Sequence, residues 1–493
     1  MKSVHNNTHK PGGVPRLMKL LRPGVESLLA GCVVLASSQL AMAQAAPAEP
    51  LLTAAQVRSL TPQQASAHLP VRLKAVVTYW EVYSRFVQDE TAGIYLLENT
   101  NLPAVKPGQM VEVEGVTSPG EYAPMIIPGS VKVVGDGNLP AAKPATVEEL
   151  LTGQEDSQFV ELGGIVRTVR VSGDGKQCEL DVLSSGERFT VRSRLLPAAE
   201  MQVLVDSTIK VRGVCSTLFN RQRQIFGFRL LAALPTNVVL EQPAPANPFE
   251  VASQSIGSLL QFKARGSFGH RVKLTGTVVY HEPGSALFIQ GEKEGVYCQT
   301  RERTPLKSGE RVEVLGFPAK GEYTPVLQDA IYRKIGEGVA PVPTKLDLDE
   351  VLAGTNDCQL IQISANLLER TERGRERFLV LESKGFIFNA YLGQDIVSGS
   401  GFAPMQNGSE VSVTGICLIE RGANWRAGEG WRAKSFRLLL RSPADVVVQT
   451  APPWWMQWGF GRTIGVLIVI ILAALLRISV LQRRLAAQRQ KTT

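Results

Sequence analysis

Histidine is scarce in this sequence, which has five His among 493 residues. Three of them, His68, His270 and His281, lie beyond the first 43 residues and are far apart. The H-E-x-x-H motif of zinc enzymes, the G-x-S-x-G motif of hydrolases and the P-loop are all missing. These absences argue against an enzyme, and we therefore predict no catalytic residues, no metal site and no cofactor.

Cysteine is equally rare, with six in the whole chain. Five remain if the first 43 residues are removed, and an odd, widely scattered set is neither a disulfide framework nor a zinc site. Most stand in runs that read as strands, so we expect buried thiols, with a single bridge as the alternative. These five are Cys178, Cys215, Cys298, Cys358 and Cys417.

A basic excess is also missing from most of the chain, although the net charge is +8. The positive residues gather at the two ends, which leaves about −1 for residues 44–476. A general nucleic-acid binder needs a basic excess on the binding domain itself, so we consider nucleic acid an improbable partner.

The N-terminal segment 1–43 reads as a signal peptide. A basic start is followed by a small, apolar stretch that ends in Ala41-Met42-Ala43, an A-x-A cleavage pattern. Leu29-Ala30-Gly31-Cys32 also matches a lipoprotein cleavage box, but the apolar run before Cys32 is short. Cleavage after Ala43 is the prediction, and lipoprotein processing is the alternative.

The C-terminal segment 454–481 predicts an interfacial tryptophan stretch followed by one transmembrane helix. Ile464 to Leu476 is an unbroken apolar run. Tryptophans favour the headgroup level, and the basic residues behind the run place the tail 482–493 in the cytoplasm. We therefore expect a single-pass protein of the bacterial inner membrane with most of the chain in the periplasm. The tryptophans ahead of the run are Trp454, Trp455 and Trp458.

The chain contains an internal repeat. Val71–Tyr79 returns as Val272–Tyr280, and Gly108–Gly115 returns as Gly309–Gly316, with shifts of 201 or 202 residues. So many blocks at one shift indicate a duplication. Further matched blocks are Phe86–Gln88 with Phe288–Gln290, Gly93–Tyr95 with Gly295–Tyr297, Gly120–Pro124 with Gly321–Pro325, Asp156–Gln158 with Asp357–Gln359, and Phe228–Leu230 with Phe436–Leu438.

Each copy divides again into two sets of about five short strands. Strands alternate in polarity or are rich in β-branched residues, and Gly/Pro turns separate them. Closure into a small barrel removes exposed sheet edges, so the predicted fold is mainly β, with OB-like barrels first and small β-sandwiches second. The predicted barrels span residues 44–144, 145–245, 246–343 and 344–450.

The region from Leu51 to the membrane resembles the extracytoplasmic sensor part of a family of bacterial two-component histidine kinases. The resemblance is carried by Leu52–Leu60, Leu69–Tyr79, Glu155–Gln158, Ile256–Phe262 and Pro452–Trp455, together with Phe86–Asp89, Gly93–Tyr95, Gly108–Pro124 and Gly269–Val272. It implies tandem OB-like domains that sense an extracytoplasmic ligand ahead of one membrane helix. None of these residues is catalytic.

The sequence departs from that family behind the membrane helix. Only twelve residues follow Leu481, and the last histidine is His281. We therefore expect the transmitter, a kinase or another cytoplasmic partner, to be a separate chain, or the sequence to be a truncated kinase. A homodimer is compatible with either case.

The candidate ligand-binding residues are aromatic and acidic residues near turns. Barrels of the OB type bind along one sheet face and its loops, where an aromatic ring offers a stacking surface. A Tyr between Gly and Pro also makes a tight turn of purely structural role, and we favour that role for the repeated G-E-Y turn. The candidates are Tyr79, Trp80, Glu121, Tyr122, Tyr280, Glu322, Tyr323, and Trp425 and Trp431 in a loop inserted only in the second copy.

Three functions follow from these features. The first is a non-catalytic, membrane-anchored sensor that lacks its own kinase domain. The second is a tethered envelope module that binds oligosaccharide or single-stranded nucleic acid. The third, a hydrolase with a hidden site, ranks last because the sequence offers no nucleophile–base pair.

Overall fold

The structure is a computed structural model. It describes residues 49–489 apart from 100–101, 173–174, 176, 194–202, 262–268, 374–375, 394–401, 403–404, 427–429 and 453–459. The predicted signal peptide and the tryptophans Trp454, Trp455 and Trp458 lie outside the described residues.

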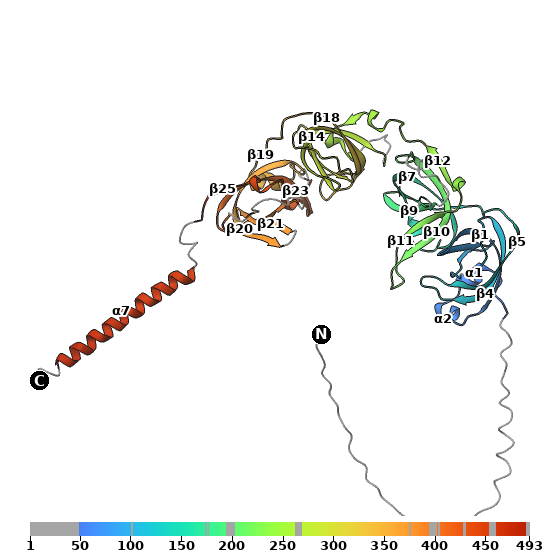
Figure 1. Cartoon of the computed structure of the whole chain (residues 1–493), viewed down its shortest axis with the longest axis horizontal. Helices are drawn as coiled ribbons and strands as arrows, with labels where there is room; N and C mark the ends of the chain where they lie inside the picture. The colour runs from blue at the N-terminus through green and yellow to red at the C-terminus, as the bar shows by residue number, and fades with distance from the viewer. Residues whose placement is uncertain are drawn as a thin grey trace, which may run out of the picture. The chain divides into compact units, whose positions relative to one another are not determined.

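Four β-sheets account for most of the described chain (Figure 1). Barrel 1 consists of β1 (Pro70–Glu81), β2 (Ser84–Gln88), β3 (Gly93–Tyr95), β4 (Gln109–Ser118) and β5 (Met125–Asp136). Barrel 2 consists of β7 (Phe159–Val171), β8 (Cys178–Ser184), β9 (Glu187–Ser193), β10 (Thr208–Phe219) and β11 (Ile225–Ala232), with β6 (Lys143–Pro144) and β12 (Val238–Gln242) at its edges.

The second copy repeats this arrangement. Barrel 3 consists of β14 (Val272–Glu282), β15 (Ala286–Gln290), β16 (Gly295–Thr300), β17 (Arg311–Ala319) and β18 (Val326–Gly336), with β13 (Ser253–Gln254) beside β14. Barrel 4 consists of β20 (Leu360–Arg373), β21 (Glu376–Ser383), β22 (Phe386–Leu392), β23 (Glu410–Arg426) and β24 (Gly430–Leu440), with β19 (Thr344–Lys345) and β25 (Val446–Thr450) at its edges.

All four sheets close in the same way. The first three strands form an antiparallel meander, the first strand also pairs with the fourth, and the fourth pairs with the fifth. A parallel contact between the third and fifth strands completes the ring, as in the Leu96–Ile126 bridge and the β9–β11 pairing. Barrels 3 and 4 close through β16–β18 and β22–β24. This closed five-stranded ring confirms OB-like barrels over the sandwich alternative.

Alternation along the strands decides which side chains enter each core. In β4, Val111 and Val113 are buried, whereas the alternating Glu112 and Glu114 point outward. Short helices add apolar residues to three barrels: α1 (Ala54–Arg58), α3 (Val147–Leu151) and α5 (Leu348–Leu352), each begun by a capping box. The remaining short elements are α2 (Pro62–Ala65) and the 3₁₀ turns η1 (Pro235–Asn237), η2 (Pro248–Glu250), η3 (Ile256–Ser258) and η4 (Pro443–Asp445).

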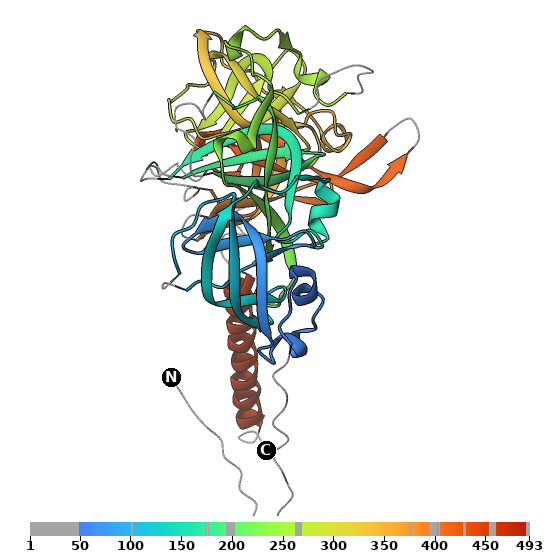
Figure 2. The same cartoon turned by 90° about the vertical axis from the view of Figure 1, so that its right-hand side faces the viewer.

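The sheets draw their strands from the four predicted segments with one small difference. Lys143 and Pro144, which we assigned to the end of the first barrel, pair in parallel with Val160 and Glu161 of β7 in barrel 2. In barrel 4, β23 and β24 form a long hairpin that extends beyond the ring (Figure 2).

The five cysteines after residue 43 are all buried and unbridged, as expected. Burial raises the pKa of Cys215, Cys298 and Cys417 far above that of an exposed thiol, because a thiolate is poorly solvated inside the barrels.

A single long helix, α7 (Phe460–Arg489), ends the described chain (Figure 1). Its segment Ile464–Ala486 has a mean hydropathy of 2.9 and none of it is buried against protein. A helix of this length and polarity is suited to cross a bilayer, and it is the one such helix among the described residues, which fits a membrane protein with a C-terminal transmembrane helix. The helix continues past Leu481, where we placed the end of the span, as far as Arg489.

Candidate functional site

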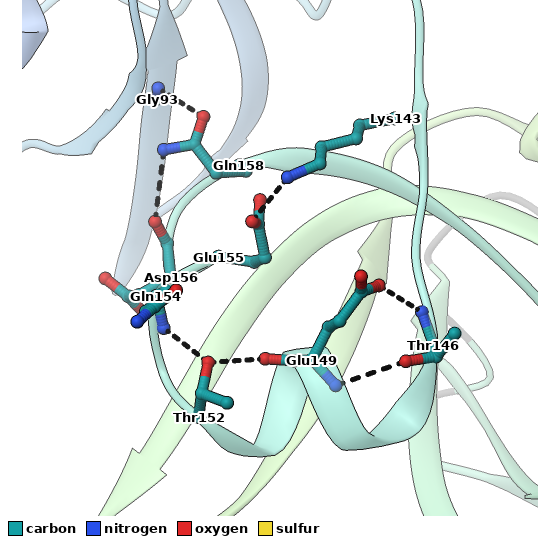
Figure 3. Close-up of polar contacts among 9 residues, drawn as sticks. All are labelled: Gly93, Lys143, Thr146, Glu149, Thr152, Gln154, Glu155, Asp156 and Gln158. Atoms are coloured by element: carbon teal, nitrogen blue, oxygen red, sulfur yellow. Dashed lines mark hydrogen bonds and ion pairs between the residues drawn. The ribbon is translucent and has the colours of Figure 1, made fainter.

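Barrels 1 and 2 interlock through hydrogen bonds from backbone amides to glutamine side chains. The Gly93 amide donates a hydrogen bond to Gln158 Oε1 (3.0 Å), and the Phe159 amide donates to Gln88 Oε1 (2.9 Å). Figure 3 shows Gln158 reaching from the segment after α3 to β3 of the neighbouring barrel. The approach is so close that a Cβ on Gly93 would lie 1.9 Å from the carbonyl oxygen of Ser157.

Barrels 3 and 4 interlock through the equivalent residues. The Leu360 amide donates to Gln290 Oε1 (3.5 Å), and Gln359 Nε2 donates to the Lys293 carbonyl (2.8 Å). A Cβ on Gly295 would lie 2.1 Å from the carbonyl oxygen of Cys358. The duplication has therefore preserved the contact between two barrels as well as the barrels.

A small apolar cluster fills each of these interfaces. In the first copy it includes Tyr79, Phe86 and Phe159, and in the second copy Phe288 and Leu360 take the corresponding places. Burial of such side chains stabilises the paired arrangement. Each barrel pair therefore contains a core of its own in addition to the cores of the two barrels.

A cleft opens beside each cluster. Cleft 1, between barrels 1 and 2, has a volume of about 430 Å³, and cleft 2, between barrels 3 and 4, about 470 Å³. The two clefts share six pairs of equivalent residues of identical type. These pairs are Phe86/Phe288, Tyr95/Tyr297, Glu121/Glu322, Tyr122/Tyr323, Asp156/Asp357 and Arg229/Arg437.

The tyrosine of the G-E-Y turn leans across the interface. Tyr122 stacks on Phe219 of β10, with ring centroids 5.5 Å apart, and its hydroxyl covers Gly153, where a Cβ would lie 1.8 Å away. Tyr323 covers Gly354 in the same way, with 2.1 Å to the hydroxyl. Burial, helped by a nearby aspartate, raises the pKa of both phenols, so both are neutral donors at neutral pH.

The aspartate of each cleft, buried at Asp357 and half-buried at Asp156, holds the loops of the two barrels in place. Asp357 Oδ1 accepts from the Ile419 amide (2.9 Å), and its Oδ2 accepts from the amide and hydroxyl of Thr324. Asp156 Oδ1 accepts from the Thr217 amide (3.1 Å). Because these oxygens already bind backbone donors, the aspartates position the cleft walls.

The arginine of each cleft differs in its surroundings. Arg437 Nη2 lies 3.7 Å from Glu322 Oε2 across cleft 2. Arg229 Nε donates to the Ser216 hydroxyl (3.3 Å), and within the described ranges no carboxylate lies within 4.0 Å of its guanidinium. Burial, followed by repulsion from Arg192, lowers the pKa of Arg229.

Acidic residues outnumber basic ones in both clefts. Glu98, Glu121 and Asp156 face Arg229 in cleft 1, so the lining carries a net charge of −2. Glu282, Glu322 and Asp357 face Arg437 in cleft 2, again with a net charge of −2. Aromatic rings make up much of the remaining wall. The arrangement suits a small ligand that carries a positive charge on an apolar body.

The structure brings four of the predicted residues into these clefts: Glu121, Tyr122, Glu322 and Tyr323. Tyr79 is 2% exposed in the apolar cluster, where its hydroxyl donates to Glu81 (2.7 Å).

Tyr280 and Trp80 take other places. Tyr280 packs in the corresponding cluster of the second copy, with its hydroxyl close to Gly393. Trp80 packs against the core of barrel 1 under the Arg85 guanidinium (5.3 Å to the ring centroid) and does not line cleft 1.

Trp425 and Trp431 face each other in register near the end of the β23–β24 hairpin. Their side chains lie outside the described part of the structure. The prediction that they contact ligand, partner or lipid headgroups therefore stays a prediction.

Sequence reasoning missed four of the six lining pairs. Phe86, Tyr95, Asp156 and Arg229 and their equivalents occur in the repeated blocks, but the repeat alone did not mark them as a site. The sequence signal that could have found them is that aromatic, acidic and arginine residues are identical at equivalent positions of the two copies.

Known proteins add little to this geometry. No protein-family model matches the sequence, and no curated protein matches it significantly. Parts of the chain are similar to aspartyl-tRNA synthetase from Entamoeba histolytica, with 12% identity over 22% of both chains and a TM-score of 0.18. Asparaginyl-tRNA synthetase from Pyrococcus horikoshii shows 19% identity over 22% of this chain and 23% of that chain, with a TM-score of 0.16.

A murine DNA-binding protein bound with double-stranded DNA shows 10% identity over 37% of this chain and 98% of that chain, with a TM-score of 0.20. This chain spans about a quarter of the length of the two synthetases. Similarity at this level carries no statement about function.

Proposed function

We propose that this protein is a non-catalytic, membrane-anchored receptor that binds a small extracytoplasmic ligand in clefts 1 and 2. The observation that carries the proposal is the repetition of the cleft. Both copies keep the same two aromatics, tyrosine, glutamate, aspartate and arginine around a cavity of similar volume. Packing alone requires apolar residues at such a joint, whereas this lining keeps exposed ionisable groups at Glu121 and Glu322 as well.

The ligand class follows from the charge and the aromatic walls. Each cleft has a net charge of −2, and in cleft 1 no basic side chain of the described residues lies within ion-pair distance of Glu98 or Glu121. An ammonium group would be attracted by these carboxylates and by the faces of Tyr95 and Tyr122. The phosphates of a nucleic acid would be repelled.

The direction of the membrane helix supports an extracytoplasmic position for the barrels. Arg477, Arg483, Arg484 and Arg489 follow the apolar run within α7, and acids are missing from the same stretch. Positive residues stay on the cytoplasmic side, and this charge pattern supports a periplasmic position for the barrels of a bacterial inner-membrane protein.

Signalling through this helix requires a cytoplasmic partner. The resemblance to sensor regions of two-component histidine kinases supports a kinase supplied in trans or a kinase from which this sequence is derived. The helix α7 continues to Arg489, beyond the apolar run, so it provides a basic helical surface that such a partner or a second copy of the chain could bind.

A tethered module for oligosaccharide is the second candidate, favoured by the stacked Tyr122–Phe219 pair in the lining of cleft 1. The two functions differ in the ligand that the full chain binds in detergent. Titration calorimetry with phenethylammonium, spermidine, neutral tetrasaccharides and oligothymidylate separates them.

Binding of an ammonium probe that Glu121→Gln together with Glu322→Gln weakens about fivefold supports the receptor proposal, because one nearby charge contributes about 1 kcal/mol in such a setting. The matched control changes two exposed glutamates away from the clefts, Glu114→Gln and Glu369→Gln. Binding of the saccharides alone would favour the tethered module, and silence with every probe would overturn both.

A further inference from the structure

Barrels 2 and 3 meet in a polar joint that is unlike the apolar interfaces within each pair. Arg188 Nη2 of β9 contacts Asp329 Oδ2 (3.0 Å) and Gln328 Oε1 (2.7 Å) of β18. On the other side of the joint, Asp206 Oδ1 accepts hydrogen bonds from the Arg271 amide (3.0 Å) and contacts His270 Nδ1 (3.0 Å). The joint therefore depends on charged contacts.

Arg167 lies at the centre of this joint. Its side chain is 2% exposed, and its guanidinium stacks on the Phe317 ring of barrel 3 at 3.8 Å from the centroid. Arg271 approaches the same ring at 5.1 Å. Asp329 lies 3.8 Å from Arg167 Nε but also pairs with Arg188 at shorter distance. Asp329 thus contacts two arginines, of which Arg188 also pairs with Asp181 (2.9 Å), while Arg271 stands beside them.

The hydrogen-bonding capacity of these arginines is not met. Arg167 Nε and Nη2 and Arg271 Nε are buried and have no hydrogen-bond partner among the described residues. A buried guanidinium nitrogen without an acceptor is costly, and native proteins usually supply a partner, a water or an ion. Burial and then the neighbouring Arg188 lower the pKa of Arg167 to about 10, although Asp329 and Asp181 act in the opposite direction.

Arg167 belongs to this joint specifically and not to the barrel repeat. The equivalent bulge position in β20 of barrel 4 is occupied by Leu368, which is 44% exposed. Barrel 4 is followed by the membrane segment and not by another barrel. A cationic side chain is therefore present only where a second barrel can cover it.

A cavity of about 300 Å³ adjoins the buried Arg167 and the half-buried Arg271. Its lining contains four arginines and two acids: Arg167, Arg271, Arg301, Arg303, Glu302 and Asp329. The charge of these residues sums to +2, in contrast to −2 in clefts 1 and 2. Among these lining residues Arg301 and Arg303 are exposed, whereas Arg167 is buried.

We propose that this cavity is an anion site that binds a sulfate- or phosphate-type oxyanion between barrels 2 and 3. Guanidinium groups donate in a planar fork that matches the oxygens of such an anion, and buried arginines are the residues of choice for it. The bound oxygens accept the free hydrogens of Arg167 and Arg271. The volume leaves room for part of a larger molecule if the oxyanion is an ester.

Occupancy would link the two barrel pairs, because the ligating residues come from both sides. Arg167 belongs to β7, and Arg271 and Arg301–Arg303 belong to barrel 3. A bound anion stabilises the joint by mass action, in proportion to how much better the closed joint binds it. This inference is independent of the proposed ligand of clefts 1 and 2, because none of the cavity residues lines either cleft.

The test is a calorimetric titration of the full chain in detergent with sodium sulfate and with sodium phosphate. Chloride keeps the ionic strength constant, since general screening would otherwise weaken the ion pairs of the joint. Acetate serves as the planar monoanion for comparison. Hydrogen exchange of Thr168 to Val171 and of Ala330 to Tyr332 is followed in the same samples.

Sulfate or phosphate is expected to bind and to slow exchange on both sides of the joint, and acetate to bind at least about tenfold more weakly. Arg301→Gln with Arg303→Gln, both exposed and thus compatible with folding, should weaken binding about tenfold or more. The control changes two exposed arginines elsewhere, Arg221→Gln and Arg311→Gln.

Three results would overturn the proposal. Absence of sulfate and phosphate binding is the first, and acetate binding as tight as that of either oxyanion is the second. The third is unchanged affinity in the Arg301/Arg303 double variant, which would place the bound anion elsewhere. Ammonium-probe binding in clefts 1 and 2 is measured separately, so failure of one proposal leaves the other testable.

Discussion

Replacement of Gly93 by alanine tests whether barrels 1 and 2 are locked together as the structure describes. An added Cβ would lie 1.9 Å from the Ser157 carbonyl oxygen and 2.7 Å from its carbon. Backbone atoms cannot move aside as a flexible side chain can. Gly93 has no left-handed φ, so the alanine itself is not strained and the interface alone bears the cost.

The magnitude follows from two contributions. Overpacking of a tight contact costs roughly 1–3 kcal/mol. The Gly93 amide would also lose its hydrogen bond to Gln158, which contributes about 1 kcal/mol. A total of roughly 2–4 kcal/mol corresponds to roughly thirty- to several-hundredfold faster opening of the interface.

Hydrogen exchange of the full chain measures this opening. The amide of Phe159, which donates to Gln88 of the neighbouring barrel, should exchange faster in Gly93→Ala, whereas the inner strands of each barrel keep their protection. Gly135→Ala is the matched control, because nothing lies within 4 Å of an added Cβ there. Unchanged exchange in Gly93→Ala, or equal loss in the control, would refute the interlocked arrangement.

Three further predictions concern other parts of the chain. The pKa of His270 is raised because Asp206 accepts its hydrogen bond. The pair therefore stabilises the barrel 2–3 joint fully below pH 6.5, the unperturbed pKa, and this stabilisation is lost as the pH rises through the higher pKa of the folded state. Asp206→Asn should abolish this pH dependence, measured as hydrogen exchange at the joint. The Arg437–Glu322 pair is about half exposed, so Glu322→Gln should lower the stability of the chain to urea by less than about 1 kcal/mol, and a larger loss would show that the pair is structural. N-ethylmaleimide should leave every cysteine after residue 43 unmodified in the native chain and should modify all of them after denaturation. Rapid labelling of the native chain would contradict the burial of these residues, which are Cys178, Cys215, Cys298, Cys358 and Cys417.

The fold was predictable because its determinants are local. Alternation in segments such as Val111–Glu114 selects the buried face of a strand, and the Gly/Pro turns set the strand lengths. The same pattern of strands and turns recurs after 201 or 202 residues, so the second copy supports the strand assignments made in the first. The membrane helix could be predicted from the length and polarity of the apolar run alone.

The candidate site was predictable only in part because its geometry is not local. Tyr122 belongs to the turn after β4, yet it covers Gly153 after α3 of the next barrel. Such a contact depends on how two barrels dock, which no spacing within one segment encodes. Asp156 and Arg229 have identical residues at the equivalent positions of the second copy, but this identity does not distinguish residues that line a cleft from residues that stabilise a turn.

The joint between the barrel pairs could not be predicted from the sequence, for a different reason. Arg167 has an exposed Leu368 as its counterpart, so the repeat offers no second example of a buried arginine at this position. A lone arginine in a strand reads as a solvated residue. Only the docking of Phe317 over its guanidinium shows that it is buried.

The most direct test of the account is the stoichiometry of ammonium-probe binding to the full chain. Phenethylammonium should fill two sites, one lost on Tyr122→Ala with Glu121→Gln in cleft 1 and the other on Tyr323→Ala with Glu322→Gln in cleft 2. The four substitutions together should abolish binding without unfolding the barrels, as checked by circular dichroism. Binding that persists in the fourfold variant while the chain remains folded would contradict the claim that the duplicated cleft is the receptor site.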